Sequence, residues 1–173
     1  MKKQIYIIDT SAILSGKPIN LDDVNMITTP SVSEELTPGG RDYRTFQFLQ
    51  EKGLSIQSAS KESANKIKKT AEETGDKYRL SSADVEILAL ALDVNKIDDK
   101  KEAVILTDDY SIQNVANTLN IKFQSFSQRG IRKKFKWHYR CPGCGKRFKE
   151  SVKICPICGT KTKISIRHKN HIK

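Results

Sequence analysis

The chain alternates between short, continuous apolar runs and longer segments in which apolar residues recur with the period of a helix. The apolar runs are rich in β-branched residues, which predicts buried strands. They span 4–8, 26–29, 54–58, 103–107 and 121–126. The predicted helices span 42–52, 61–74, 83–94 and 111–119, and a further helix starts at Pro30. Strands that alternate with helices predict an α/β fold, in which a mostly parallel sheet is flanked by helices.

Charge divides the chain into two parts. Residues 1–126 contain 16 Lys or Arg and 19 Asp or Glu, whereas residues 127–173 contain 15 Lys or Arg and one acid, Glu150. The resulting net charges are −3 and +14. Such asymmetry predicts a module that binds a polyanion beside a separate domain. Nucleic acid is favoured over a membrane surface, because no amphipathic or membrane-spanning stretch accompanies the charge.

All four cysteines lie in the basic part, within two similar loops. The loops are Cys141-Pro142-Gly143-Cys144-Gly145 and Cys155-Pro156-Ile157-Cys158-Gly159. Glycine after the second cysteine tolerates a left-handed backbone, so each loop can turn tightly and direct two thiolates to one point. Two such loops supply the four ligands of a structural Zn²⁺ site, the pattern of a zinc ribbon. Disulfides are the alternative. No secretory signal is recognised before the loops, which favours zinc and a reducing cytoplasm.

Length sets the boundaries between the parts. About 125 residues suffice for one globular domain with its own core, whereas roughly 35 residues need a metal to fold. We therefore divide the chain into a globular domain at 1–126, a basic linker at 127–138, the zinc ribbon at 139–161 and a basic tail at 162–173.

Acidic residues follow the predicted strands or open the apolar helix at 83–94. They are Asp9, Glu34, Glu35, Asp84, Asp108 and Asp109. Functional residues of parallel sheets gather at the carboxyl ends of the strands. Taken singly, most of these acids are equally explained as helix-capping, turn-forming or solvated residues. Asp9 is the exception, because an acid that adjoins a buried strand needs a partner.

Taken together, the acids indicate a cation site. Carboxylates in one cleft raise one another's pKa unless a cation lies among them. Oxygen ligands suit Mg²⁺ or Mn²⁺, which can activate a water molecule and neutralise charge on a phosphate. All three histidines follow residue 137, so residues 1–126 offer no rival nucleophile triad. Metal-assisted phosphodiester hydrolysis is therefore the favoured chemistry.

Four stretches resemble, in order and approximate spacing, the motifs of PIN-domain ribonucleases, a likeness that covers about residues 3–126. They are residues 8–11, 30–36, 80–84 with the following apolar helix, and 106–110. Residues 111–115 and the ribbon narrow the resemblance to the archaeal type of the NIN-one-binding family. Members of this family are endonucleases that mature the 3′ end of small-subunit ribosomal RNA. The resemblance implies a PIN-like sheet and a metal-dependent endoribonuclease that acts on pre-ribosomal RNA.

Carried over by position, the family's acids fall on a set of four residues. The implied catalytic residues are Asp9, Glu35, Asp84 and Asp109. Of these, Asp9, Asp84 and Asp109 are implied to hold the Mg²⁺ or Mn²⁺. Glu35 is preferred to Glu34 because the family's acid directly precedes an aliphatic residue, here Leu36.

Two further residues, Asp108 and Ser11, lie beside this implied site. Asp109 is preferred to Asp108 because the family's acid stands two places after the Thr or Ser that ends the strand, here Thr107. Asp108 then either assists or is only a neighbour. The resemblance implies that the Ser11 hydroxyl orients a ligand or water beside Asp9; the alternative is that Ser11 only caps the following helix.

Basic residues before the ribbon alternate with aromatic ones. Single-stranded RNA binders use cations for phosphates and aromatic faces for unpaired bases. The predicted RNA-binding residues are Arg132, Lys133, Lys134, Lys136 and Trp137. The alternative is that Trp137 and Tyr139 pack on the ribbon itself. The tail either adds phosphate contacts or only keeps the chain soluble.

The favoured function is cleavage of pre-ribosomal RNA in the small-subunit precursor, with the acids cutting and the basic ribbon gripping the RNA. Assembly-factor proteins are further candidate partners, and no membrane is expected. One alternative is a toxin-type PIN ribonuclease, which usually lacks a ribbon. Another is a non-catalytic RNA-binding assembly factor, against which the complete set of acids argues.

Overall fold

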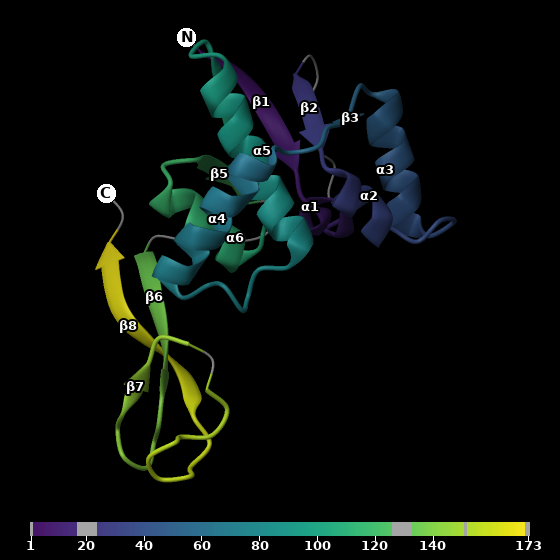
Figure 1. Ribbon diagram of the computed structural model, residues 1–173. Helices are drawn as coiled ribbons and strands as arrows, with labels where there is room; N and C mark the ends of the chain where they lie inside the picture. The colour runs from purple at the N-terminus through teal and green to yellow at the C-terminus, as the bar shows by residue number, and fades with distance from the viewer. Residues whose placement is uncertain (1, 17–23, 126–132, 151, 172–173) are drawn as a thin grey trace.

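The computed structural model describes residues 2–16, 24–125, 133–150 and 152–171, with the backbone alone described at 133–137 and 165–171. Two sheets are present in this part of the chain, one of five strands and one of three. Figure 1 shows the larger sheet among its helices and the smaller sheet projecting from one side.

The larger sheet is entirely parallel, in the order β3-β2-β1-β4-β5. Its strands are β1 (Lys3–Ile8), β2 (Asn25–Thr28), β3 (Ser55–Ile56), β4 (Lys101–Leu106) and β5 (Lys122–Gln124). Its helices are α1 (Thr10–Leu14), α2 (Pro30–Glu35), α3 (Arg41–Glu51), α4 (Lys61–Thr74), α5 (Ser82–Ile97) and α6 (Tyr110–Thr118). The predicted α/β class, with a parallel sheet flanked by helices, is confirmed.

The core lies around the two central strands. Ile7, Ile8 and Ile105 are fully buried, as expected for parallel strands covered on both faces. Helix α5 packs on β1 and β4, and its run from Ile87 to Ala91 is buried. This explains why α5 is apolar almost all round its surface.

The strand order reverses between β1 and β4. These strands pair in register from Lys3 with Lys101 to Ile8 with Leu106, so they end side by side. In open parallel sheets, the crevice beyond such a reversal is the usual place for a ligand. The residues that follow Ile8 and Leu106, Asp9 and Thr107, therefore lie at this position.

The smaller sheet is antiparallel, in the order β7-β6-β8. It comprises β6 (Lys133–Arg140), β7 (Arg147–Phe148) and β8 (Lys163–His171). Strands β6 and β8 run into the ranges assigned from sequence to the linker and the tail. Strand β6 also packs against α4 and α6, and His138 on it is buried. The boundaries of the sequence-based division stay a prediction.

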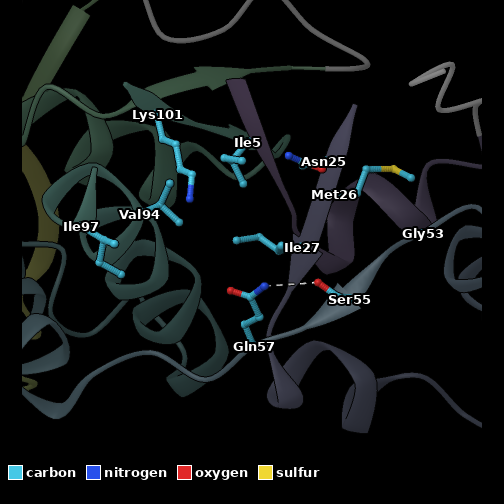
Figure 2. Close-up of a pocket in the computed structure, with 10 residues that line it drawn as sticks. All are labelled: Ile5, Asn25, Met26, Ile27, Gly53, Ser55, Gln57, Val94, Ile97 and Lys101. Atoms are coloured by element: carbon cyan, nitrogen blue, oxygen red, sulfur yellow. Dashed lines mark hydrogen bonds between the residues drawn. The ribbon is translucent and has the colours of Figure 1, made fainter. Parts of the chain in front are cut away.

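A hollow of about 280 Å³ opens near the amino ends of the parallel strands (Figure 2). Ile5, Asn25 and Lys101, early in β1, β2 and β4, are among its lining residues. None of the ten residues drawn there is a carboxylate. We therefore place the chemistry at the other end of the strands, where the acids lie.

Candidate active site and metal centre

Asp9 follows β1 directly and is the N-cap residue of α1. Its carboxylate is buried, and Oδ2 accepts hydrogen bonds from Ser11 Oγ at 2.5 Å and from Thr107 Oγ1 at 2.7 Å. Burial raises the pKa of Asp9, and the bonds from Ser11 and Thr107 oppose that rise. The two hydroxyls thus hold the carboxylate in one orientation and favour its charged form.

Asp84 lies in the first turn of α5 and takes part in a capping box. Its backbone N–H donates to Ser81 Oγ at 3.1 Å, and its Oδ2 accepts from the Ser81 backbone N–H at 2.6 Å. The helix-stabilising role considered from sequence is therefore present. Burial raises the pKa of Asp84, and the negative charges of Asp109 and Asp9 raise it further. Asp109 and Asp9 therefore both lie near enough to Asp84 to disfavour its charged form.

Asp108 and Asp109 differ in what their carboxylates contact. Asp109 is the N-cap residue of α6, and its Oδ1 accepts from the Ser111 N–H at 2.6 Å. Asp108 Oδ1 instead accepts from Ser125 Oγ at 2.5 Å, just beyond β5. The Asp108 backbone N–H donates to Ser11 Oγ at 3.0 Å. The structure thus places Asp109 near Asp84, whereas Asp108 Oδ1 contacts Ser125.

Glu35 is the exposed last residue of α2. Its Oε2 accepts a hydrogen bond from Thr10 Oγ1 at 2.5 Å. Because Thr10 follows Asp9 in the chain, this bond places the Glu35 carboxylate at the same end of the sheet as the other acids.

Two further residues, Thr107 and Gln113, support the site. The Thr107 hydroxyl is fully buried, donates to Asp9 and accepts from the Asp109 backbone N–H at 3.0 Å, so it joins two of the acids. Gln113 on α6 is also buried, and its Nε2 donates to the Thr107 carbonyl at 2.9 Å. A threonine before two acids hints at the first role, but nothing in the helical pattern marks the second.

The two cysteine loops have the same backbone geometry. Gly145 and Gly159 both adopt a φ of +75°, the left-handed conformation predicted for these positions. Gly145 N–H donates to the Cys141 carbonyl at 2.9 Å, and Gly159 N–H donates to the Cys155 carbonyl at 2.9 Å. Each loop therefore directs its two cysteines to one side.

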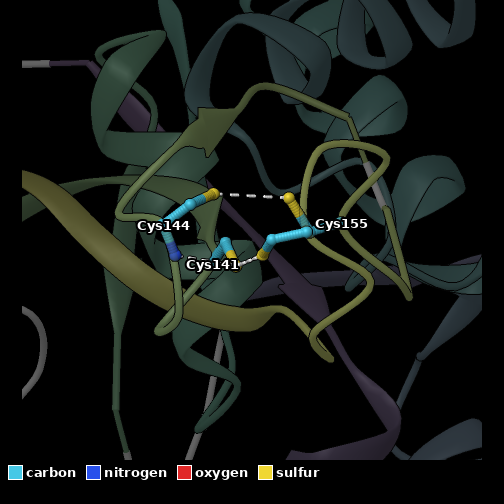
Figure 3. A group of neighbouring side chains, drawn as sticks. Cys141, Cys144 and Cys155 are labelled. Atoms are coloured by element: carbon cyan, nitrogen blue, oxygen red, sulfur yellow. Dashed lines mark hydrogen bonds between the residues drawn. The ribbon is translucent and has the colours of Figure 1, made fainter.

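The four sulfur atoms converge, as Figure 3 shows for Cys141, Cys144 and Cys155. All four lie within 4.8 Å of one another, with Cys141 and Cys158 at 3.3 Å and Cys144 and Cys155 at 3.5 Å. These separations exceed an S–S bond of about 2 Å and approach the edge of a tetrahedron with bonds of about 2.3 Å to a metal. The Thr160 hydroxyl and backbone N–H lower the pKa of Cys158 to about 6. Against a backbone hydrogen bond from Lys146, burial and the neighbouring thiols raise the pKa of Cys144 to about 11, so without a metal the cluster holds both thiolate and thiol. The cluster can hold a metal ion and fits a zinc ribbon.

The acids do not converge as the cysteines do. Within the described residues, the four cysteines are the one group of three or more His, Cys, Asp or Glu side chains that lie close enough to hold a metal ion between them. The predicted RNA-binding residues are only partly described. Arg132 lies outside the described residues, and Lys133, Lys134, Lys136 and Trp137 lie on β6 with their side chains outside them. In the described part, no helix has the length and apolar character needed to cross a membrane.

Comparison with known proteins defines the class. The family described as the PIN domain of ribonuclease matches residues 6–94, a range that begins within β1, ends within α5 and includes three of the four implied acids. The endoribonuclease Nob1 of Archaeoglobus fulgidus is 40% identical over 157 residues, covering 91% of this chain and 88% of its own length. The fold, the acids and these matches together define a PIN-domain ribonuclease.

Further relatives extend this result to the particular family. The endoribonuclease Nob1 of Pyrococcus abyssi is 35% identical over 160 residues, 91% of each chain. A ribonuclease VapC1 of Thermoplasma acidophilum is 40% identical over 159 residues, 92% of this chain and 77% of its own. The chain belongs to the Nob1 endoribonuclease family, and it is a nuclease that acts on RNA.

Proposed function

We propose that this protein is a divalent-metal-dependent endoribonuclease that cleaves pre-ribosomal RNA at the 3′ end of the small-subunit RNA. The observation that carries the proposal is the grouping of Asp9, Asp84 and Asp109: the Thr107 hydroxyl contacts both the Asp9 carboxylate and the Asp109 backbone N–H. In addition to burial, the charges of Asp109 and Asp9 raise the pKa of Asp84. Acids that repel one another at the reversal point of a parallel sheet are suited to hold a cation.

Asp9, Asp84 and Asp109 would hold Mg²⁺ or Mn²⁺, and Glu35 completes the catalytic set. Mg²⁺ keeps several of its waters and takes few carboxylates directly, so its site does not require all of the acids to converge as the four cysteines do. When bound, the cation supplies the positive charge that activates water and neutralises the phosphate. We assign the ligand role to Asp109 because its charge acts on Asp84, whereas Asp108 Oδ1 accepts a hydrogen bond from Ser125.

The chain's own residues set the geometry of the acids before any cation binds. Ser11 and Thr107 orient Asp9, and the backbone N–H of Ser81 orients Asp84. The backbone N–H of Ser111 does the same for Asp109. Fixed acids of this kind reduce the reorganisation required when the substrate binds.

We assign a structural Zn²⁺ to the four cysteines and RNA binding to the basic residues around them. A closed site with four thiolates leaves no open position for catalysis. The net charge of +14 over residues 127–173 supplies attraction to phosphates. We assign Arg132, Lys133, Lys134, Lys136 and Trp137 to RNA contact, in the cytoplasm, with the pre-small ribosomal subunit as the partner.

The test is cleavage of an RNA that spans the 3′ end of the small-subunit RNA, with mapping of the products. With Mn²⁺ or Mg²⁺ the intact protein should cut at one position, and Asp9→Asn should be inactive. A second RNA with the same composition and a shuffled sequence is the control. Equal cutting of both RNAs would favour a less selective, toxin-type ribonuclease. Specific binding of the first RNA without any cutting would favour a non-catalytic assembly factor.

A further inference from the structure

The loop between α4 and α5, residues 75–81, is held firmly at both ends. At its start, the Oδ2 atom of the buried Asp76 accepts from Thr74 Oγ1 at 2.7 Å and from Asn114 Nδ2 at 2.6 Å. At its end, Ser81 forms the capping box with Asp84. Because Asp84 is one of the proposed catalytic acids, the loop has a fixed position relative to the site.

The middle of this loop exposes a basic and aromatic sequence, Lys77-Tyr78-Arg79. The Tyr78 side chain is 55% exposed, and Lys77 Nζ lies 5.8 Å from the centre of its ring. Arg79 Nε donates to Ser111 Oγ at 3.3 Å, and the Ser111 backbone N–H donates to Asp109 at 2.6 Å. The Arg79 guanidinium is therefore held beside the acids, because Ser111 forms hydrogen bonds with both Arg79 and Asp109.

The larger sheet and its helices form what we call the nuclease unit. The loop lies on the side of this unit that faces the ribbon. In Figure 1 it runs along the lower edge of the larger unit, where the carboxyl ends of β1 and β2 point. Strand β6 of the smaller sheet packs against α4 and α6, the helices that anchor Asp76. Glu72, and more weakly Glu150 of the ribbon, raise the pKa of Lys77. An RNA strand that extends from the ribbon to the acids would cross this loop.

We propose that Tyr78 and Arg79 form an RNA-binding element at the edge of the active site, in which Tyr78 stacks on an unpaired base and Arg79 binds a backbone phosphate close to the cut. An exposed aromatic ring is a suitable surface for any base, and a guanidinium binds phosphate through two parallel hydrogen bonds. The inference rests on the proposed function only in taking single-stranded RNA as the substrate. It adds a contact on the nuclease unit to those of the basic ribbon.

The chain contains a matched control for Tyr78. Phe48 on α3 is also 55% exposed, and Lys52 Nζ lies 5.8 Å from the centre of its ring. Helix α3 lies on the far side of the unit from the ribbon in Figure 1. Phe48→Ala therefore removes an equally exposed aromatic ring with the same type of cation contact, away from the proposed RNA path.

The experiment measures the affinity of the full-length protein for a single-stranded RNA at several salt concentrations, with single 2-aminopurine bases at successive positions. Tyr78→Ala should weaken binding about 5- to 150-fold, the effect of losing one base stack, and should relieve the fluorescence quenching at one position only. Arg79→Gln should reduce the slope of log affinity against log salt by about 0.7, as for one phosphate contact on a single strand. Phe48→Ala should change neither quantity.

The inference would be overturned if Tyr78→Ala and Arg79→Gln bind RNA with the same affinity and salt dependence as Phe48→Ala. The loop would then be a surface for a protein. This result can be distinguished from a failure of the proposed function. If the intact protein binds RNA but does not cut it, the proposed function fails, and the affinities of the variants can still be measured. Tyr78→Phe keeps the ring, so its affinity should stay within about 3-fold of the intact protein.

Discussion

Replacing Thr107 with valine should destabilise the protein and shift its pH dependence, because this buried hydroxyl joins two of the acids. Valine has nearly the same shape, so the change removes hydrogen bonds without creating a cavity. The hydroxyl donates to the Asp9 carboxylate at 2.7 Å and accepts from the Asp109 N–H at 3.0 Å. Thr28 is a control with an equally buried hydroxyl, which donates only to the Ile8 carbonyl at 2.7 Å.

The two substitutions should differ in magnitude. A hydrogen bond to a charged group contributes about 1.5–3 kcal/mol, and leaving the Asp109 N–H without its acceptor costs about 1 kcal/mol more. Thr107→Val should therefore lower the free energy of unfolding by about 3 kcal/mol at neutral pH. Thr28→Val loses one bond between neutral groups and should cost about 1 kcal/mol.

The sign of the pH dependence follows from Asp9. Its pKa in the folded protein lies above the ordinary value of 3.8, because burial disfavours the charged form. The contribution of Asp9 to stability is therefore greatest below pH 3.8, where this acid is protonated in both states, and it falls as the pH rises through the folded pKa. Without the Thr107 hydroxyl the folded pKa rises further, so the cost of Thr107→Val should grow with pH.

Urea unfolding between pH 4 and pH 8, without added Mg²⁺ or Mn²⁺, measures these effects. The difference between the two variants should be about 2 kcal/mol at neutral pH and should shrink towards pH 4. The rate of cleavage should also begin to decline at a higher pH in Thr107→Val than in the intact protein as the solution is acidified, because Asp9 must be ionised to hold a cation. Equal costs for Thr28→Val and Thr107→Val at every pH would refute this role of Thr107.

Three further outcomes are expected. Elemental analysis should find one zinc per chain, and a metal-free protein would contradict the zinc assignment. Removal of the zinc by a chelator should unfold the ribbon, whereas circular dichroism should still detect the helices of residues 1–126. Gly143→Ala should loosen the zinc site, because its new Cβ would lie 2.7 Å from Thr160 Oγ1, and unchanged zinc retention against a chelator would count against this packing. Deleting residues 127–173 should weaken RNA binding and make its affinity less dependent on salt. Trp137→Ala should lower the affinity for RNA with little change in the slope of log affinity against log salt. If the truncated and intact chains have the same affinity at every salt concentration, the ribbon binds another partner.

The central part of the fold follows from the sequence because buried parallel strands are continuous apolar runs. The run at 4–8 corresponds to β1 (Lys3–Ile8), and the run at 103–107 corresponds to β4 (Lys101–Leu106). Strand β6 was harder to predict. Its alternation of basic and aromatic residues suits both a strand and an RNA-binding segment, and only pairing with β8 decides the backbone conformation.

The directions of individual side chains do not follow from the sequence. Asp108 and Asp109 are identical neighbours at the end of a strand, so only the resemblance to a family motif distinguishes them in the sequence. The N-terminus of α6 fixes the Asp109 carboxylate, and Ser125, distant in sequence, takes that of Asp108. The same limit applies to Thr107, whose role depends on Asp9 lying at the end of the neighbouring strand β1.

The most direct test of the account compares two aspartates on one helix. Asp84 at the start of α5 is a proposed cation ligand, whereas Asp93 near its end accepts hydrogen bonds from Ser60 and Ser63. The rate of RNA cleavage in Mn²⁺ should fall roughly 10²-fold or more in Asp84→Asn, as for loss of a group that stabilises the transition state. Asp93→Asn should cleave at close to the rate of the intact protein. Cleavage by Asp84→Asn at the rate of the intact protein would contradict a catalytic centre built on these acids.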